Sequence, residues 1–220
     1  MKGYLSRTTV IALGDKNMNI AVFGATGSTG QRFCRRALDA GHTIKPYSFS
    51  RTEIAGVEEL QSTPINLNDK EALLQSLMDV DAVVSAIGGE TSTRYTGISN
   101  LLGALQKLNI KRIVAIGGAG ILSTPTGGTL KEQESFPAFL IPISNAHQAA
   151  REQLQKSNLQ WTMICPGTMK EGTSQGSYRH QADTILSAHK GVLYDDVAHL
   201  ILRSLQEKLY VQQRVSVSNP

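Results

Sequence analysis

The chain has 220 residues and a mass of 23.8 kDa, enough for one substantial hydrophobic core and short for two domains. Its 40% apolar and 18% charged residues are typical of a globular protein and exclude the disordered class, and no apolar run is long enough to span a bilayer. The net charge of +4 is scattered, so an anionic cofactor or substrate explains it as well as a polyanion does, and we expect no nucleic-acid or membrane partner.

Residues 1–17 precede the first expected strand and contain a short apolar stretch, Val10 to Leu13, that does not resemble a secretory signal. We therefore expect an N-terminal extension over 1–17 and one domain over 18–220. Cys34 and Cys165 lie within apolar stretches, as buried thiols do in a reducing compartment. These features indicate a cytoplasmic protein.

The apolar run at residues 20–23 leads directly into the turn Gly-Ala-Thr-Gly-Ser-Thr-Gly at residues 24–30, and an amphipathic helical pattern follows. A helix that begins at such a turn presents unpaired N–H groups and a positive dipole end, which suit a diphosphate. One glycine takes the turn, one lets the backbone approach the phosphates, and one lets helix and strand pack closely. The sequence therefore predicts a dinucleotide site here, with the pair Arg35-Arg36 on the solvent face of the helix.

The second strand is expected over Thr43 to Phe49 and arrives at Ser50-Arg51. In NAD-binding proteins an acidic side chain at this point binds the ribose 2′-hydroxyl, whereas a 2′-phosphate requires a cation such as arginine. Here the first carboxylate, Glu53, comes only after Arg51, so NADPH is favoured over NADH. The alternative is that Arg51 is a solvated loop cation, because Pro46 leaves the end of the strand uncertain.

Strand and helix patterns then alternate along the chain. Continuous rather than alternating apolarity, as in the strand at 81–87, indicates strands that are covered on both faces, hence a parallel sheet. The sequence predicts a single-domain α/β Rossmann fold, a doubly wound parallel sheet with helices on both faces and ligands at the carboxyl ends of its strands. Its expected elements are a short strand at 63–66, helices at 69–78, 94–109 and 145–157, strands at 81–87, 113–116, 161–165 and 214–218, and a last helix that Asp195 or Asp196 caps.

Three stretches read as loops. A flexible glycine run covers residues 117–120, a loop or flap over the site covers 121–142, and a polar, glycine-rich loop covers 168–182. Trp161 opens an apolar strand and is expected in the core. No cysteine or histidine spacing suggests a metal site.

The turn at 24–30, Ser50-Arg51, the segment Ser157 to Thr162, Pro166-Gly167 and Asp196-Val197-Ala198 together give the chain its resemblance to a known family. Over residues 18–218 it resembles the atypical short-chain dehydrogenases of the NmrA-like type, and within these the flavin reductase/biliverdin-IXβ reductase group. The resemblance allows a monomer or a small homo-oligomer. It implies a cofactor site in which NADPH is held by Gly24, Thr26, Gly27, Ser28, Thr29 and Gly30, with Arg51 on the 2′-phosphate, Gly88 near the cofactor and Pro166-Gly167 near the nicotinamide.

The chain departs from most short-chain dehydrogenases at the residues that protonate a carbonyl oxygen. Gly118 stands at the position of the serine, Ile143 at that of the tyrosine and His147 at that of the lysine. Without this acid a ketone is a poor substrate, since general acid–base help is worth roughly 10²–10⁴-fold. A flavin or a bilin delocalises the charge that arrives with a hydride, so orientation of NADPH against a planar, conjugated acceptor suffices.

His147 matches a histidine of the flavin reductase group and is the candidate catalytic residue, although a structural role is an alternative. Phe136, Tyr178 and Arg179 are candidate contacts for the acceptor; anchoring of the loops, or plain surface exposure for Arg179, is the alternative. Three functions stay open: an NADPH-dependent reductase of flavins or bilins, a non-catalytic NADP(H)-binding sensor or regulator, and a reductase or isomerase of another small metabolite.

Overall fold

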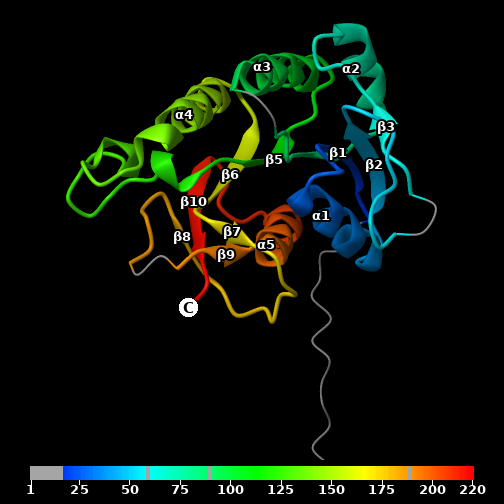
Figure 1. Ribbon diagram of the computed structural model, residues 1–220. Coiled ribbons are helices and arrows are strands. Elements are labelled where there is room, and N and C mark those ends of the chain that lie inside the picture. Colours follow the sequence, from blue (N-terminus) through cyan, green and yellow to red (C-terminus); the bar gives the residue numbers. More distant parts are fainter. Residues whose placement is uncertain (1–16, 58–59, 89–90, 188–189) are drawn as a thin grey trace, which may run out of the picture.

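The computed structural model describes residues 17–57, 60–88, 91–187 and 190–220, without the side chains of 91–95. The predicted doubly wound parallel sheet is confirmed: eight strands lie in the order β3-β2-β1-β4-β5-β6-β10-β8 (Figure 1). All neighbours pair in parallel except β10 and β8. The strands are β1 (Asn19–Phe23), β2 (Thr43–Ser48), β3 (Thr63–Pro64), β4 (Ala82–Ser85), β5 (Arg112–Ile116), β6 (Gln160–Pro166), β8 (Arg179–Ala182) and β10 (Gln213–Ser218).

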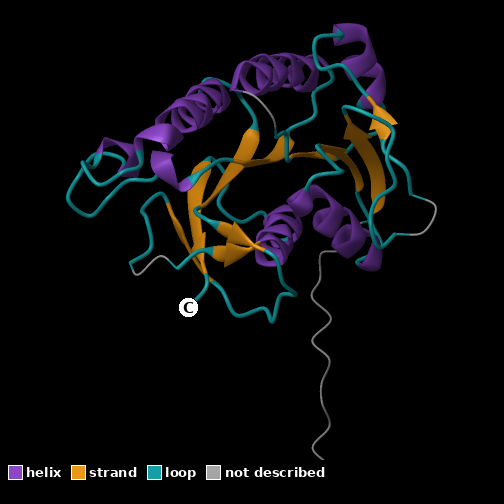
Figure 2. Ribbon diagram, in the orientation of Figure 1, coloured by secondary structure: helices purple, strands orange, loops and turns teal. Residues whose placement is uncertain are grey.

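Helices cover both faces of this sheet (Figure 2). One face carries α2 (Lys70–Ser76), α3 (Thr91–Lys107) and α4 (Ile141–Gln155), and the other carries α1 (Ser28–Asp39) and α5 (Tyr194–Gln206). Alternate residues of each central strand enter the two hydrophobic layers: in β1, Ala21 and Phe23 face α2 and α3, whereas Ile20 and Val22 face α1 and α5. No helix in the described part of the chain is long and apolar enough to cross a membrane.

Pro46 lies inside β2 rather than ending it. It pairs with Val22 of β1 on one side, while β3 joins the other side of β2 only from Tyr47 onward. A proline is tolerated in a strand where no neighbour needs its missing N–H. The strand therefore reaches Ser48 and delivers Ser50-Arg51 to the carboxyl edge of the sheet, as expected from the sequence.

Several element ends differ from the sequence-based prediction. α4 begins at Ile141 rather than Asn145, because Pro142 lies in its first turn, where a proline is tolerated. Part of the expected loop at 168–182 is strand, since β8 pairs antiparallel with β10. Two further short strands, β7 (Met169–Lys170) and β9 (Val192–Leu193), pair beside the main sheet, and the loop at 121–142 contains the 3₁₀ turns η1 (Ala119–Ile121, at its start), η2 (Leu130–Glu132) and η3 (Ala138–Leu140).

Trp161 is 3% exposed, so its assignment to the core is confirmed. Cys34 and Cys165 are buried free thiols, and burial raises the pKa of each to about 12. At neutral pH neither sulfur is a thiolate, so neither is available as a nucleophile.

Candidate cofactor and acceptor site

The three glycines of the turn between β1 and α1 have three different environments. Gly24 has φ +87°, and a Cβ there would lie 2.3 Å from the carbonyl oxygen of Ala86, which follows β4. Gly30 lies in the first turn of α1, and its Cβ would lie 2.2 Å from the carbonyl oxygen of Gly24. The fold therefore needs Gly24 for the turn and Gly30 for close packing of helix on strand.

Gly27, in contrast, is not required by the protein's own packing. It is exposed, its φ of −73° suits any residue, and a Cβ would meet only the Gly24 carbonyl oxygen, at 3.4 Å. The first helical hydrogen bond of α1 runs from the N–H of Gln31 to the oxygen of Gly27, at 3.0 Å. The amides of Ser28, Thr29 and Gly30 thus precede the helical ladder and have no helix carbonyl to bond. This open backbone fits a diphosphate, which a Cβ at position 27 would obstruct.

Thr26 and Ser28 lie on the surface of this turn, and both use their backbone carbonyls within the chain. The Thr26 oxygen accepts a hydrogen bond from Nε2 of Gln31 at 2.6 Å, and the Ser28 oxygen accepts one from Arg32 at 2.7 Å. Thr29 is only 6% exposed and lies behind the turn, where its hydroxyl approaches the sulfur of Met169. The structure therefore brings the six predicted residues together, with Thr29 on the buried side.

Arg51 is exposed at the base of the segment that leaves β2. The fully buried hydroxyl of Ser62 lies beneath this segment: it accepts from the N–H of Thr52 at 3.1 Å and lies 3.0 Å from the carbonyl oxygen of Ser50. Ser48 donates to the same hydroxyl at 2.7 Å. These serines hold the peptides on either side of Arg51, so its backbone position is defined.

Gly88 and Pro166-Gly167 lie at the carboxyl ends of neighbouring parts of the sheet. Gly88 follows β4, is exposed, and a Cβ there would meet nothing within 4 Å. Pro166 is the last residue of β6 and is buried, and Gly167 is partly exposed beside it. Since β4 and β6 flank β5, these residues and the turn at 24–30 share one edge of the sheet.

His147 of α4 lies against the backbone that follows β5. A Cβ on Gly118 would lie 2.8 Å from Nδ1 and 3.0 Å from Cε1 of His147. The φ of −149° at Gly118 is open to any residue, so only the imidazole excludes a side chain there. Ile143 is partly exposed one turn earlier on the same helix. The structure thus brings Gly118 and His147 together and leaves an imidazole where a side chain at position 118 would lie.

The glycine run at 117–120, predicted to be flexible, is instead packed. A Cβ on Gly117 would lie 2.9 Å from the sulfur of Met163, and one on Gly120 would lie 2.3 Å from the hydroxyl of Ser144 and 3.0 Å from Cζ of Phe136. These glycines let α4 approach the end of β5. Phe136 is half-buried against Gly120, so it belongs to the wall between the 121–142 loop and the sheet edge.

Tyr178 and Arg179 both have partners within the protein. The Tyr178 hydroxyl lies 3.1 Å from Nδ1 of His199 on α5, and burial raises the pKa of Tyr178 above its ordinary value. Arg179 begins β8 and donates to the carbonyl oxygen of Ser187 at 3.2 Å. His180 follows with its Nδ1 2.6 Å from the hydroxyl of Tyr210. These bonds attach the end of the loop that precedes β8 to the body of the protein.

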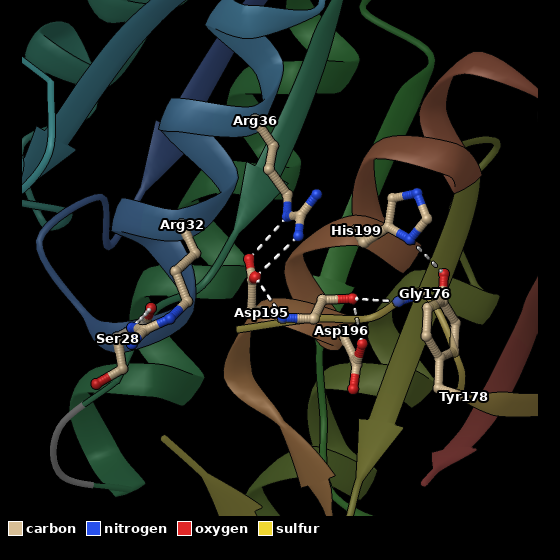
Figure 3. Close-up of polar contacts among 9 residues, drawn as sticks. Ser28, Arg32, Arg36, Gly176, Tyr178, Asp195, Asp196 and His199 are labelled. Carbon is tan, nitrogen blue, oxygen red and sulfur yellow. Dashed lines mark hydrogen bonds and ion pairs between the residues drawn. The ribbon is translucent and has the colours of Figure 1, made fainter. Parts of the chain in front are cut away.

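Sequence reasoning missed the contact that joins α1 to this loop. Arg36 donates from Nε and Nη2 to the two carboxylate oxygens of Asp195, at 2.7 and 2.8 Å, and the N–H of Ser174 donates to the same carboxylate at 2.8 Å (Figure 3). Ser174 Oγ also donates to Asp196, and Asn219 binds the other oxygen of Asp196 at 3.2 Å. The prediction that one of these aspartates caps α5 is wrong, since both lie buried in its first turn.

The placement of Arg36 on a solvent face is likewise wrong, because α5 packs on that side of α1. Burial raises the pKa of Asp195, but the hydrogen bonds from Arg36 and Ser174 outweigh burial and hold it below its ordinary value. Because Asp195 stays ionised beside Arg36, it keeps the loop at 171–178 attached to α1. No spacing within the sequence could have revealed this pair, which joins residues far apart in the chain.

Comparisons with known proteins place this geometry among its relatives. The chain is 24% identical to the uncharacterised protein YwnB of Bacillus subtilis, over 91% of this chain and 98% of YwnB. It is 26% identical to the photosystem II assembly factor Ycf39 of Synechocystis, over 67% of this chain and 44% of Ycf39. The chain thus corresponds to nearly all of the first relative and to less than half of the second.

Solved structures share the fold over almost the whole chain. A Burkholderia pseudomallei protein described as exported superposes with a TM-score of 0.82 at 26% identity, covering 91% of this chain and 99% of that one. A Streptococcus pneumoniae protein provisionally named an NADH-flavin reductase gives 0.78 at 24% identity, covering 93% and 100%. A short-chain dehydrogenase/reductase of Veillonella parvula in complex with NADP gives 0.73 at 18% identity, covering 93% and 96%.

The family match covers the glycine turn, the sheet edge and all of α5. The model of the NAD(P)H-binding family matches residues 24–208, which is most of the chain. With the open amides at 28–30 and the strand ends that surround them, this match establishes that the chain belongs to the NAD(P)H-binding family.

Proposed function

We propose that this protein is an NADPH-dependent reductase that transfers hydride to a flavin or to a similar conjugated acceptor such as a bilin. The observation that carries the proposal is the Gly118–His147 pair. The imidazole fills the space that a side chain at position 118 would need, where the resemblance to short-chain dehydrogenases implies a serine, and Ile143 stands where that resemblance implies the tyrosine. The site therefore lacks the hydroxyl acid that reduction of an isolated ketone requires, and an acceptor that delocalises charge does not need one.

The cofactor side of the proposal rests on the open amides of α1 and on Arg51. The exposed guanidinium of Arg51 follows β2 directly, and an arginine at this place favours a 2′-phosphate over a free 2′-hydroxyl. The NADP bound to the Veillonella neighbour supports the same choice. The name of the Streptococcus neighbour supports a flavin as the acceptor.

When bound, the reduced nicotinamide supplies the hydride, and the residues of this chain hold and orient it. The amides at the start of α1 hold the diphosphate, while Pro166-Gly167 and Gly88 border the nicotinamide end. His147 defines the wall of the acceptor site opposite the sheet edge, where its ring orients the acceptor. The charge that the acceptor gains is neutralised by a proton from solvent, so no side chain has to donate one.

The acceptor side is apolar and open to solvent. Residues 137–142 form a continuous exposed run, Pro-Ala-Phe-Leu-Ile-Pro, that leads into α4 ahead of His147. Phe139 is 81% exposed, and Phe136 beside Gly120 continues the same surface toward the sheet edge. A flat, largely apolar ring system gains most from such a surface, since burial of apolar area drives its binding.

A second candidate is a non-catalytic NADP(H)-binding sensor or assembly factor. The similarity to Ycf39 favours it, and the missing serine, tyrosine and lysine would be natural in a protein that only reports on its cofactor. The alignment covers less than half of Ycf39, so the assembly role in that name belongs to a protein more than twice as long as the matched part.

Steady-state oxidation of NADPH with FMN, riboflavin and biliverdin, corrected for oxidation by oxygen, tests the proposal. We expect turnover with at least one of these acceptors and a higher kcat/KM with NADPH than with NADH. The same preparation is titrated with NADPH in the absence of an acceptor. Tight binding without turnover on any acceptor would replace the reductase by the sensor.

A further inference from the structure

Three arginines, Arg32, Arg35 and Arg36, lie on α1, and only two of them have a partner. Arg32 forms an ion pair with Glu171, and Arg36 forms one with Asp195. Within the described ranges of the chain, the exposed side chain of Arg35 makes no hydrogen bond and no ion pair. Among these three arginines, Arg35 is therefore the one without a hydrogen bond or an ion pair in the described part of the fold, although its charge contributes to the lowered pKa of Asp195.

Arg35 borders a cavity of about 350 Å³ on the outer side of α1. This volume is in the range of small-molecule sites. The cavity lies between α1, the turn that follows β2 and the loop that follows β7. Its walls are formed by Gln31, Arg32 and Arg35 from α1, Ala55 and Gly56 from the turn, Gly172 and Thr173 from the loop, and Asp195 from α5.

The turn over Arg35 is the tip of a hairpin that begins at Arg51. The N–H of Ser62 donates to the oxygen of Thr52 at 2.8 Å, and the N–H of Ile54 donates to the oxygen of Leu60 at 2.9 Å, so the chain folds back on itself after β2. Ile54 is 1% exposed and packs in the hydrophobic layer that contains α1. The hairpin is thereby held against α1.

At its tip, Gly56 has φ +77° and lies directly over Arg35: a Cβ on Gly56 would be 3.2 Å from Nη1 of that arginine. The same short hairpin therefore has Arg51 at its base and Arg35 beneath its tip. The residues that the structure describes give neither guanidinium a hydrogen-bond partner.

Neither carboxylate near the cavity forms an ion pair with Arg35, because Asp195 is paired with Arg36 and Glu171 with Arg32. Arg36 and the N–H of Ser174 occupy both oxygens of Asp195, and Glu171 is paired with Arg32 and 69% exposed. A guanidinium presents a planar fork of N–H donors that matches a phosphate in two-point fashion. The charge and shape of the cavity thus favour a phosphate monoester.

The position of the cavity indicates which phosphate this is. In a Rossmann fold the ribose of the adenosine lies beside the end of the second strand, close to the helix that follows the glycine turn. We propose that Arg35 is a second binding residue for the 2′-phosphate of NADP and that it acts with Arg51 to select NADP over NAD. The inference rests on the proposed function, which supplies the dinucleotide.

The test measures binding of four probes to Arg35→Ala by calorimetry: NADPH, NADH, adenosine 2′,5′-bisphosphate and adenosine 5′-phosphate. We expect Arg35→Ala to weaken NADPH and the bisphosphate by about tenfold or more and to leave NADH and the monophosphate unchanged, because one charge-assisted contact to the 2′-phosphate is lost. Arg35→Lys should recover part of the loss. Lys156→Ala, which removes an exposed cation directly after the end of α4, controls for net charge and should change no affinity.

The outcomes separate this inference from the proposed function. If the wild-type protein binds neither NADPH nor the bisphosphate, the proposed function fails and this inference fails with it. If NADPH binds and Arg51→Ala lowers the NADPH preference while Arg35→Ala does not, only the assignment of Arg35 is overturned. If Arg35→Ala lowers turnover with FMN relative to riboflavin and spares the NADPH preference, the phosphate belongs to the acceptor, which also overturns the assignment.

Discussion

The imidazole of His147 occupies the space that a side chain at position 118 would need, with Nδ1 2.8 Å from where a Cβ on Gly118 would lie. The glycine and the histidine are therefore one structural unit, although they are 29 residues apart in the chain. A serine cannot be restored at 118 without moving His147.

Gly118→Ser should displace His147 and lower kcat for the flavin or bilin acceptor by up to about 100-fold, because a misplacement near 1 Å at a reacting centre costs that much. The Kd for NADPH should stay within about threefold, since the diphosphate site lies at the other end of the cofactor. Stopped-flow hydride transfer and NADPH titration measure the two effects. Gly103→Ala is the matched control, because a Cβ there meets nothing within 4 Å. Equal kcat in both variants would return His147 to a structural role.

Gly27→Ala and Gly30→Ala should separate cofactor binding from folding. The first should keep the thermal midpoint and weaken NADPH by about tenfold or more, because its Cβ meets only one protein atom at 3.4 Å but enters the space of the diphosphate. The second should lower the free energy of unfolding by about 3 kcal/mol, because its Cβ would lie 2.2 Å from a backbone oxygen. Unchanged NADPH affinity in Gly27→Ala would remove the diphosphate from this turn.

Asp195→Asn should loosen the attachment of the 171–178 loop to α1. The amide cannot match both donors of Arg36, and we expect the free energy of unfolding to fall by about 2 kcal/mol, a discounted value because Arg36 is partly exposed. Urea unfolding gives this number, and hydrogen exchange at Ser174 should accelerate in the variant. Asp39→Asn, an exposed carboxylate at the end of the same helix, provides the comparison. Equal losses in the two variants would mean that the pair contributes nothing specific.

Stability should fall as the pH is lowered through the titration range of His199. Burial first, and then the charges of Arg36 and Arg203, lower the pKa of His199 below its ordinary 6.5. The unfolded chain therefore binds a proton at a higher pH than the folded one, and stability that is complete above 6.5 is lost progressively as the pH falls toward the folded pKa. His199→Gln should flatten the pH dependence of the unfolding free energy between about pH 7 and 5.

Tyr178→Phe is the companion variant for this titration. It removes the hydroxyl that lies 3.1 Å from Nδ1 of His199 but keeps the imidazole, so the slope should persist while stability at pH 7 falls by about 1 kcal/mol. Asp195 does not contribute in this range, because its pKa lies below 3.8 and its stabilisation is lost only at more acidic pH. A slope that is unchanged in His199→Gln would assign the effect to another group, such as His180.

Much of the fold could be predicted from the sequence because the patterns that indicate strands, helices and turns are local. Continuous apolar strands, amphipathic helices and the glycine turn predict a doubly wound parallel sheet, and the structure confirms it. The ends of the elements were harder to predict. Pro46 lies within β2 because no strand pairs with it on the side of its missing N–H, and this depends on where β3 begins to pair. The glycine run at 117–120 predicts a flexible loop, because the sequence does not show which side chains from other elements pack against these glycines.

The sequence by itself determined the class of cofactor, because phosphate recognition at a glycine turn uses backbone amides whose order in the chain is also their order in space. Only the tertiary structure decided that His147 fills the space of a side chain at position 118, that Arg36 pairs with Asp195, and that Arg35 borders a cavity. These residues become neighbours only after the sheet forms and the helices pack on it. Burial and neighbouring charge, rather than residue type, therefore decide the role of each residue.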